Sequence, residues 1–154
     1  MGCREVFRLQ SAEKCEKPGT IPKSRPRKAS KKYGIAFESA VARKTGGIHG
    51  QWFRFVDANG VGFCQTDVIL VLSGEAVVLE CKLTEVGEAR KQLGMLYIPV
   101  VQKALGIPTK GVVVARHLTR ETDRARVVSN LGLAMRAASA SYFPTVHWLG
   151  RGPI

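Results

Sequence analysis

Two turn signals in the middle of the chain restrict its fold more than any other feature. Asn59-Gly60 and Ser73-Gly74 are dipeptides found in tight β-turns, and each lies between two runs of apolar and β-branched residues. These runs, which we expect to be strands, cover roughly residues 51 to 57, 61 to 72 and 76 to 83. The pattern therefore predicts an antiparallel meander of three strands.

Helical periodicity flanks this meander. Tyr33 to Lys44 carries apolar residues at helical spacing and precedes a glycine pair, which predicts an amphipathic helix. A second helix is expected from about Val86 to Leu105, with a kink at Pro99. The remaining elements are a buried strand from Gly111 to Ala115, a helix over roughly 122 to 140 and a last strand from Thr145 to Leu149. The predicted order αβββαβαβ is that of a mixed α/β domain in which helical crossovers lead to further strands.

The composition points to a polyanionic partner. The 154 residues are 45% apolar, enough for one compact domain, and 24 Lys and Arg outnumber 12 Asp and Glu. A formal charge of +12 favours nucleic acid, but a ribosome-like structural binder or a merely soluble basic protein would carry the same charge. Charge alone leaves these classes open.

The first 32 residues are more basic than the rest, with ten Lys or Arg and three Glu. From Lys17 to Lys32 there are seven basic residues, three prolines and no acid, which is typical of a segment that cannot fold alone. We therefore expect a flexible basic arm over residues 1–32 and one domain over residues 33–154. The arm would attract phosphates, or it would be a solvated tail without a role. Its lysines assigned to phosphate contacts are Lys28, Lys31 and Lys32.

Cysteine spacing and hydropathy argue against several other classes. The four cysteines form no C-x-x-C pair, so we expect reduced thiols rather than a zinc site or a redox motif. No apolar run approaches the length of a membrane span, and the start of the chain does not read as a signal peptide. The expectation is a cytoplasmic protein without membrane contact.

Two acidic residues face each other in the predicted hairpin. If the Ser73-Gly74 turn has two central residues, the register places Asp67 directly opposite Glu80. Like charges at such positions are destabilising unless another group compensates for them, and a bound cation would do so. Lys82 lies on the same face as Glu80 and supplies one positive charge.

Carboxylate oxygens at this separation suit a hard cation. Asp67 and Glu80 could bind Mg²⁺ or Mn²⁺, with water and a substrate phosphate completing the shell, and the backbone carbonyl of Cys81 is a further candidate ligand. Zinc is disfavoured for want of His or Cys ligands in the predicted site. The alternative is a buried salt bridge in which Lys82 neutralises the carboxylates without chemistry.

Asp67, followed after a β-turn by Glu80-Cys81-Lys82, resembles the motif of the PD-(D/E)xK nuclease superfamily. The core of that superfamily is a helix, a three-stranded meander, a helix and another strand, and the expected elements from residue 33 to 116 follow this order. The resemblance implies a restriction-endonuclease-like fold and metal-dependent hydrolysis of phosphodiester bonds. By the same resemblance, Lys82 would orient the attacking water or help to deprotonate it.

Within the superfamily, the chain most resembles the archaeal-type Holliday junction resolvases. In these a Gly-x-x-x-Glu helix precedes the hairpin, as Gly34 and Glu38 do here, and the segment from Gly106 to Arg116 resembles their next strand. The resemblance implies that Glu38 binds metal directly or through water, and that the protein is a homodimer. Glu38 could otherwise be an exposed helix acid.

Other positions match the relatives less closely. The loop TGGIHG lacks the serine of the resolvases. Thr45 or His49 could take its place, but we interpret both as turn residues. Gln92 matches a glutamine on the second helix of RecB-type relatives, which makes it a candidate catalytic residue. Their tyrosine follows four residues later, whereas Tyr97 follows five residues after Gln92 and is expected in the core.

Basic residues near the expected site are candidates for contacts with nucleic acid. If Asn59-Gly60 forms a two-residue turn, Arg54 lies beside Gln65 on the face of the site. Arg43 and Lys44 end the first helix. We assign all three basic side chains to DNA binding.

The sequence thus predicts a Mg²⁺-dependent DNA endonuclease, structure-selective and active in recombination or repair. Two alternatives remain: a non-catalytic basic nucleic-acid-binding protein with a nuclease-like fold, and the nuclease subunit of a larger repair assembly. Branched junctions, flaps, duplex ends and duplex sites all suit such a core.

Overall fold

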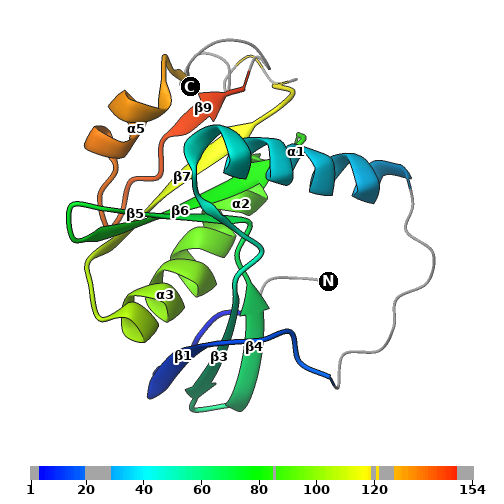
Figure 1. Cartoon of the computed structure of the whole chain (residues 1–154). Helices are drawn as coiled ribbons and strands as arrows, with labels where there is room; N and C mark the ends of the chain where they lie inside the picture. The colour runs from blue at the N-terminus through cyan, green and yellow to red at the C-terminus, as the bar shows by residue number, and fades with distance from the viewer. Residues whose placement is uncertain (1–3, 20–28, 85, 119–120, 122–126, 149–154) are drawn as a thin grey trace.

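The computed structural model of the chain describes residues 4–19, 29–84, 86–118, 121 and 127–148. The strands form two sheets, one of three strands in the order β1-β3-β4 and one of six strands in the order β2-β5-β6-β7-β9-β8. Figure 1 shows the small sheet below the large one. The strands are β1 (Ser11–Cys15), β2 (Ile48–His49), β3 (Trp52–Asp57), β4 (Gly60–Gln65), β5 (Val68–Leu72), β6 (Glu75–Lys82), β7 (Thr109–Ala115), β8 (Val127–Val128) and β9 (Thr145–His147). The helices are α1 (Ala29–Thr45), α2 (Val86–Gln92), the π-helical turn η1 (Leu93–Tyr97), α3 (Ile98–Leu105) and α5 (Leu131–Ala137).

The prediction of a mixed α/β domain is confirmed. In the large sheet β5 and β6 are antiparallel, whereas β6, β7 and β9 are parallel to one another. Helices α2 and α3 make the crossover from β6 to β7 and pack on one face of this sheet, and α1 and α5 contribute to the apolar cluster on the other. Strands covered on both faces read as continuous apolar runs, which is the pattern of β6 and β7.

The β5–β6 hairpin has the predicted register. Leu72 lies opposite Glu75 and Val68 lies opposite Leu79. The two turn residues, Ser73 and Gly74, both have positive φ, at 51° and 77°. Positive φ at both central positions is the requirement of the type I′ turn, whose twist matches that of the strands it joins.

The register predicted for the preceding hairpin is wrong. Asp57 pairs with Gly60, so that the loop consists of Ala58 and Asn59 rather than Asn59 and Gly60. The Asp57 carboxylate accepts a hydrogen bond of 2.9 Å from the Asn59 N–H, a local bond that fixes the turn one residue earlier. As a result Arg54 lies opposite Phe63 instead of Gln65.

The run from 61 to 72 is not one strand, and the three predicted strands do not share a sheet. The chain leaves the small sheet after Gln65 and enters the large one at Val68. Between them, buried Thr66 donates from its N–H and its hydroxyl to the Gln51 carbonyl, at 3.0 and 3.2 Å. Alternating exposure in β4 gives way to three successive buried residues at the start of β5, because only β5 lies between two layers.

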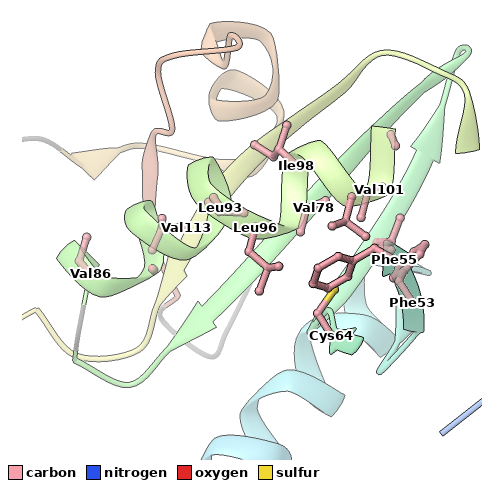
Figure 2. Packing of buried hydrophobic residues seen from close by; sticks show 14 of the residues in the cluster. Phe53, Phe55, Cys64, Val78, Val86, Leu93, Leu96, Ile98, Val101 and Val113 are labelled. Carbon is pink, nitrogen blue, oxygen red and sulfur yellow. The ribbon is translucent and has the colours of Figure 1, made fainter. Parts of the chain in front are cut away.

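The helix predicted over 86 to 105 is present, and a π-helical turn ends two residues before Pro99, where a kink was expected. Pro99 lacks an N–H, so an α-helix would leave the carbonyl of Met95 without its usual donor. The Val6 N–H fills this position and donates to the Met95 carbonyl at 2.9 Å. Figure 2 shows Leu93, Leu96 and Val101 of the crossover directed toward the apolar side chains of both sheets.

The C-terminal elements are shorter than predicted. Residues 122–126 lie outside the described part of the chain, residues 127–128 form β8, and α5 is the only described helix in the predicted range of 122 to 140. Asn130 caps α5, because its side chain accepts a hydrogen bond of 2.8 Å from the Leu133 N–H. The last strand ends at His147 rather than Leu149.

The expectation of a free arm over residues 1–32 is wrong for residues 4–19. Strand β1 pairs with β3 along its whole length, from Ser11 opposite Val56 to Cys15 opposite Trp52. Three apolar residues that the basic composition obscured, Val6, Leu9 and Ala12, pack against the core. Residues 20–28 lie outside the described part of the chain, and α1 begins at Ala29.

The described cysteines, Cys15, Cys64 and Cys81, are free thiols, as predicted. Among the described helices none is long and apolar enough to cross a membrane.

A buried carboxylate fastens this N-terminal segment to the small sheet. Asp57 accepts hydrogen bonds from Arg4 at 2.6 Å and from the Phe7 N–H at 3.1 Å. Burial raises the pKa of Asp57, but the N–H groups of Phe7 and Asn59 and the Arg4 guanidinium more than offset it and hold the pKa below its ordinary value.

We expect Asp57→Asn to lower the unfolding temperature at neutral pH but not at strongly acidic pH. A depressed pKa stabilises the fold above the pKa of the unfolded chain, about 3.9, and this contribution disappears as the pH falls through the folded pKa. Thermal unfolding of both proteins between pH 7 and pH 2 measures the difference. A constant difference over that range would contradict the role of the ionised carboxylate.

Candidate metal centre

Three carboxylates and one lysine surround the open end of the β5–β6 hairpin. Asp67 immediately precedes β5, and Glu80 and Lys82 lie in the last three residues of β6. Glu38 comes from α1, and its charge contributes to the field at Glu80. Side chains alternate along a strand, so that Glu80 and Lys82 share the face of Val78, beneath α2 and α3.

Backbone N–H groups of two neighbouring segments hold Asp67 in place, one through its side chain and one through its carbonyl. Its Oδ2 accepts a hydrogen bond of 2.8 Å from the Cys81 N–H, and its carbonyl accepts one of 3.0 Å from the Gly50 N–H. The first bond crosses from the start of β5 to the end of β6, in keeping with the predicted position of Asp67 opposite Glu80. Asp67 therefore presents its other carboxylate oxygen, Oδ1, in an orientation fixed by main-chain groups.

Glu80 is a buried acid whose negative charge is not balanced by the groups around it. Its side chain is almost inaccessible, with 3% of the residue exposed, and its Oε2 has no hydrogen-bond partner among the described residues. Burial, the charge of Asp67, a hydrogen bond with the Asp67 side chain and the more distant Glu38 raise the pKa of Glu80 well above its ordinary value. An orphaned carboxylate oxygen at this depth is costly unless a further ligand approaches it.

Lys82 balances only part of this negative charge. Its Nζ lies 4.0 Å from Oε1 of Glu80, at the limit of an ion pair, and about a quarter of its side chain is exposed. The positive charge of Lys82 lowers the pKa of Glu80 but does not offset burial and Asp67. A salt bridge with Lys82 alone leaves Oε2 of Glu80 without a hydrogen-bond partner among the described residues.

The structure brings Glu38 together with a histidine that the sequence did not assign to the site. Nε2 of His49 lies 3.4 Å from Oε1 of Glu38. His49 is the second residue of β2 and pairs with Val68, the residue after Asp67. The only sequence signal was the position of His49 within the loop that follows the helix of Glu38. Thr45, by contrast, is the last residue of α1 rather than a turn residue, and its hydroxyl donates to the Val41 carbonyl at 2.8 Å.

The Cys81 side chain lies on the opposite face of β6 from Glu80 and Lys82, in the cluster on the α1 side of the sheet. Burial, followed by the charges of Asp67 and Glu80, raises the pKa of its thiol well above the ordinary value. A thiol held neutral is a poor metal ligand, because metals bind the thiolate. Of the Cys81 groups, only the backbone carbonyl remains a candidate ligand, as expected.

Gln92 ends α2 with an unused acceptor. Its Oε1 is buried and has no hydrogen-bond partner among the described residues. Arg90, two residues earlier, donates to the hydroxyl of Thr145 on β9 at 2.8 Å. Two helical residues turn through about 200°, so Gln92 lies on the opposite flank of α2. Because the sheet order is β5-β6-β7-β9, that flank faces the hairpin of Asp67 and Glu80.

The donor set fits an open site for a hard divalent cation. Among the described residues, no three His, Cys, Asp or Glu side chains form a ready-made metal cage. Mg²⁺ does not require one, because it is usually bound by one or two carboxylates, with water and substrate phosphates in the other positions. Asp67 and Glu80 can supply two oxygen ligands, and the orphaned Oε2 of Glu80 is available for this purpose.

The basic residues assigned to DNA occupy different parts of the molecule. Arg43 and Lys44 are exposed at the end of α1, and Lys32 is exposed near its start. Arg54 lies in the small sheet, where its Nη1 is 3.7 Å from Oε1 of Glu13 on β1. The observed register does not bring Arg54 beside Asp67. The predicted contacts of Lys28 and of the Lys31 side chain lie outside the described residues.

Comparison with models of known protein families, with curated proteins and with solved structures found no match to this chain.

Proposed function

We propose that this protein is a Mg²⁺-dependent DNA endonuclease that hydrolyses phosphodiester bonds at the centre formed by Asp67, Glu80 and Lys82. The observation that carries the proposal is the orphaned, buried Oε2 of Glu80 beside a second carboxylate. A divalent cation would satisfy this oxygen and remove the repulsion between the two acids. The order of α1, the hairpin, the α2–α3 crossover and β7 further resembles the core of the PD-(D/E)xK nucleases, although here the strands before the hairpin lie in a separate sheet.

Each side chain has a distinct role in this proposal. Asp67, oriented by the Cys81 N–H, and Glu80 would hold Mg²⁺ together with the Cys81 carbonyl, and the bound ion would acidify a water and polarise the phosphate. Lys82 would orient that water and stabilise the charge that develops on the phosphate oxygens. Glu38 would bind the ion through water, and His49 would hold the Glu38 carboxylate in place. Gln92 would accept a hydrogen bond from the metal-bound water through its unused Oε1.

A polyanionic substrate matches the charge of the molecule. The net charge of +12 surrounds a centre that is itself acidic, so a phosphate backbone is attracted by the surface while the metal is attracted by the carboxylates. Arg43 and Lys44 at the end of α1 lie on the same helix as Glu38 and would contact the backbone of the bound DNA. We place the activity among structure-selective recombination and repair nucleases resembling Holliday junction resolvases, acting as a homodimer because paired incisions need two sites.

The proposal is tested with a four-way junction, a flap and a plain duplex of one sequence, in Mg²⁺ and in chelator. We expect cleavage only with Mg²⁺, and a loss of at least about 100-fold in Asp67→Ala, which removes a ligand of the ion. The matched control is Glu13→Ala, which removes an exposed acid from the small sheet.

The outcomes separate the possible activities. Symmetric paired cuts confined to the junction support a dimeric resolvase, and cuts in the other substrates indicate a more general nuclease. Cleavage by Asp67→Ala at the rate of the unsubstituted protein would exclude this centre. Binding of all three DNAs without any cleavage would instead favour a non-catalytic binding protein or an incomplete assembly.

A further inference from the structure

A cavity of about 540 Å³ lies where the parallel strands end, on the α1 side of the sheet. In sequence its walls adjoin the centre twice, because Phe37 precedes Glu38 on α1 and Leu83 follows Lys82 after β6. Ligands of α/β proteins bind preferentially outside the carboxyl ends of parallel strands. The residues that give the cavity its chemistry are Tyr33, Phe37, Leu83, Arg116, His117 and Trp148.

Three aromatic side chains from separate segments line this space. Phe37 and Trp148 meet edge to face, with ring centroids 6.1 Å apart and an angle of 74° between the rings. Tyr33 lies one helical turn before Phe37 and is 69% exposed, the most exposed of the large apolar or aromatic residues described. Aromatic rings around an open cavity provide the flat, amphipathic surface on which planar ligands stack.

The cavity also carries positive charge that is held in place. Arg116 follows β7, and its Nη1 donates to the Trp148 carbonyl at 3.2 Å, which ties the guanidinium to the aromatic wall. A guanidinium has five N–H donors, so most of them remain for another acceptor. His117 is exposed beside it. A ligand that suits both walls has a flat ring and an adjacent anionic group.

We propose that this cavity binds one unpaired nucleobase of the DNA strand that is cut, with the neighbouring phosphate against Arg116. The inference rests on the proposed nuclease function, because it is the metal centre at the same end of β6 that makes a nucleotide the expected planar anion. A base inside an intact duplex cannot enter a cavity lined in this way, since its faces are already stacked. The substrate is therefore DNA with an unpaired nucleotide next to the scissile phosphate, as at a flap, a bulge or an opened junction.

The test uses 2-aminopurine, a fluorescent base whose emission falls when it stacks on an aromatic ring. Duplexes carrying this base either unpaired in a bulge or paired with thymine are titrated with the Lys82→Ala protein in chelator, so that no strand is cut. We expect additional quenching and tighter binding for the bulged duplex. Equal quenching and equal affinity for the bulged and the paired duplex would overturn the proposal.

Two tyrosine variants test whether the unpaired base binds at this cavity. Tyr33→Ala removes an exposed ring and is expected to weaken binding of the bulged duplex at least fivefold, in line with the usual contribution of one stacked base. Binding of a duplex with an abasic bulge should be unchanged. Tyr142→Ala, which removes another exposed tyrosine from outside the cavity, is the control and should retain the affinity. Equal losses in both variants, or a loss that extends to the abasic duplex, would contradict base binding at this cavity.

The result does not depend on cleavage. If the bulged base is bound through Tyr33 but the unsubstituted protein cuts no DNA with Mg²⁺, the nuclease proposal fails and the nucleobase site stands. If the protein cuts DNA but Tyr33→Ala binds and cuts bulged and paired substrates as before, the nucleobase site fails and the nuclease proposal stands.

Discussion

Replacing Lys82 with alanine is expected to slow DNA cleavage by about 10² to 10⁴-fold, the usual contribution of a group that positions a proton or stabilises developing charge in the transition state. DNA binding in chelator should change little, because other basic residues supply most of the attraction for phosphates. Rates under single-turnover conditions, with protein in excess over DNA, measure the chemical step apart from product release.

The chain offers a matched control for this substitution. Lys110 lies on β7, pairs with Glu75 at 3.1 Å and is buried to nearly the same extent as Lys82, with side-chain exposures of 20% and 24%. It belongs to the opposite end of the sheet, since Val77 beside it lies near the start of β6. Lys110→Ala should therefore cut DNA at the unsubstituted rate. Retained cleavage in Lys82→Ala, or an equal loss in Lys110→Ala, would remove Lys82 from the mechanism.

Replacing Glu80 with glutamine should abolish cleavage and at the same time stabilise the metal-free protein. The substitution keeps the shape of the side chain but removes a buried acid from beside Asp67. Relief of about 1 kcal/mol of repulsion corresponds to a rise of about 2 to 4 °C in Tm for a chain of this size. Improved stability with lost activity is the usual sign of a strained functional site.

Thermal unfolding with and without Mg²⁺ distinguishes this explanation from a general effect on packing. A ligand that binds only the folded state raises Tm, so the unsubstituted protein should gain stability with Mg²⁺ and Glu80→Gln should gain much less. Glu75→Gln, at the other end of β6 and half exposed, should keep the full effect of Mg²⁺. A large Mg²⁺ effect that persists in Glu80→Gln would place the ion elsewhere.

The parts of the fold that depend on neighbouring residues were predictable from the sequence. The β5–β6 register follows from a turn dipeptide whose two residues adopt positive φ. The observed pairing ends at Val68 and Leu79, one residue short of Asp67 and Glu80. The crossover helix was visible in its apolar periodicity. The preceding register failed because a single side chain, Asp57, bonds to the Asn59 N–H and shifts the turn by one residue.

The features that the sequence did not reveal depend on contacts between distant segments. Strand β1 is stabilised by pairing with β3, about forty residues later, and its polar composition gives little local indication of a strand. The division between β4 and β5 reflects which layers cover each strand, and this is a tertiary property. The contact between Glu38 and His49 requires α1 to pack beside β2, which no local pattern specifies.

The chain passes from the small sheet to the large one at Thr66. The small sheet can therefore vary in shape, whereas the large sheet must keep the geometry of the candidate metal centre. The carboxylates and the lysine all follow this point or belong to α1, and β1, β3 and β4 contribute none of them. The two bonds from Thr66 to the Gln51 carbonyl close the base of the β3–β4 hairpin just before Asp67. A protein engineer could therefore exchange the tip of this hairpin for another binding element and keep the chemistry, provided that residues 51 and 66 remain joined.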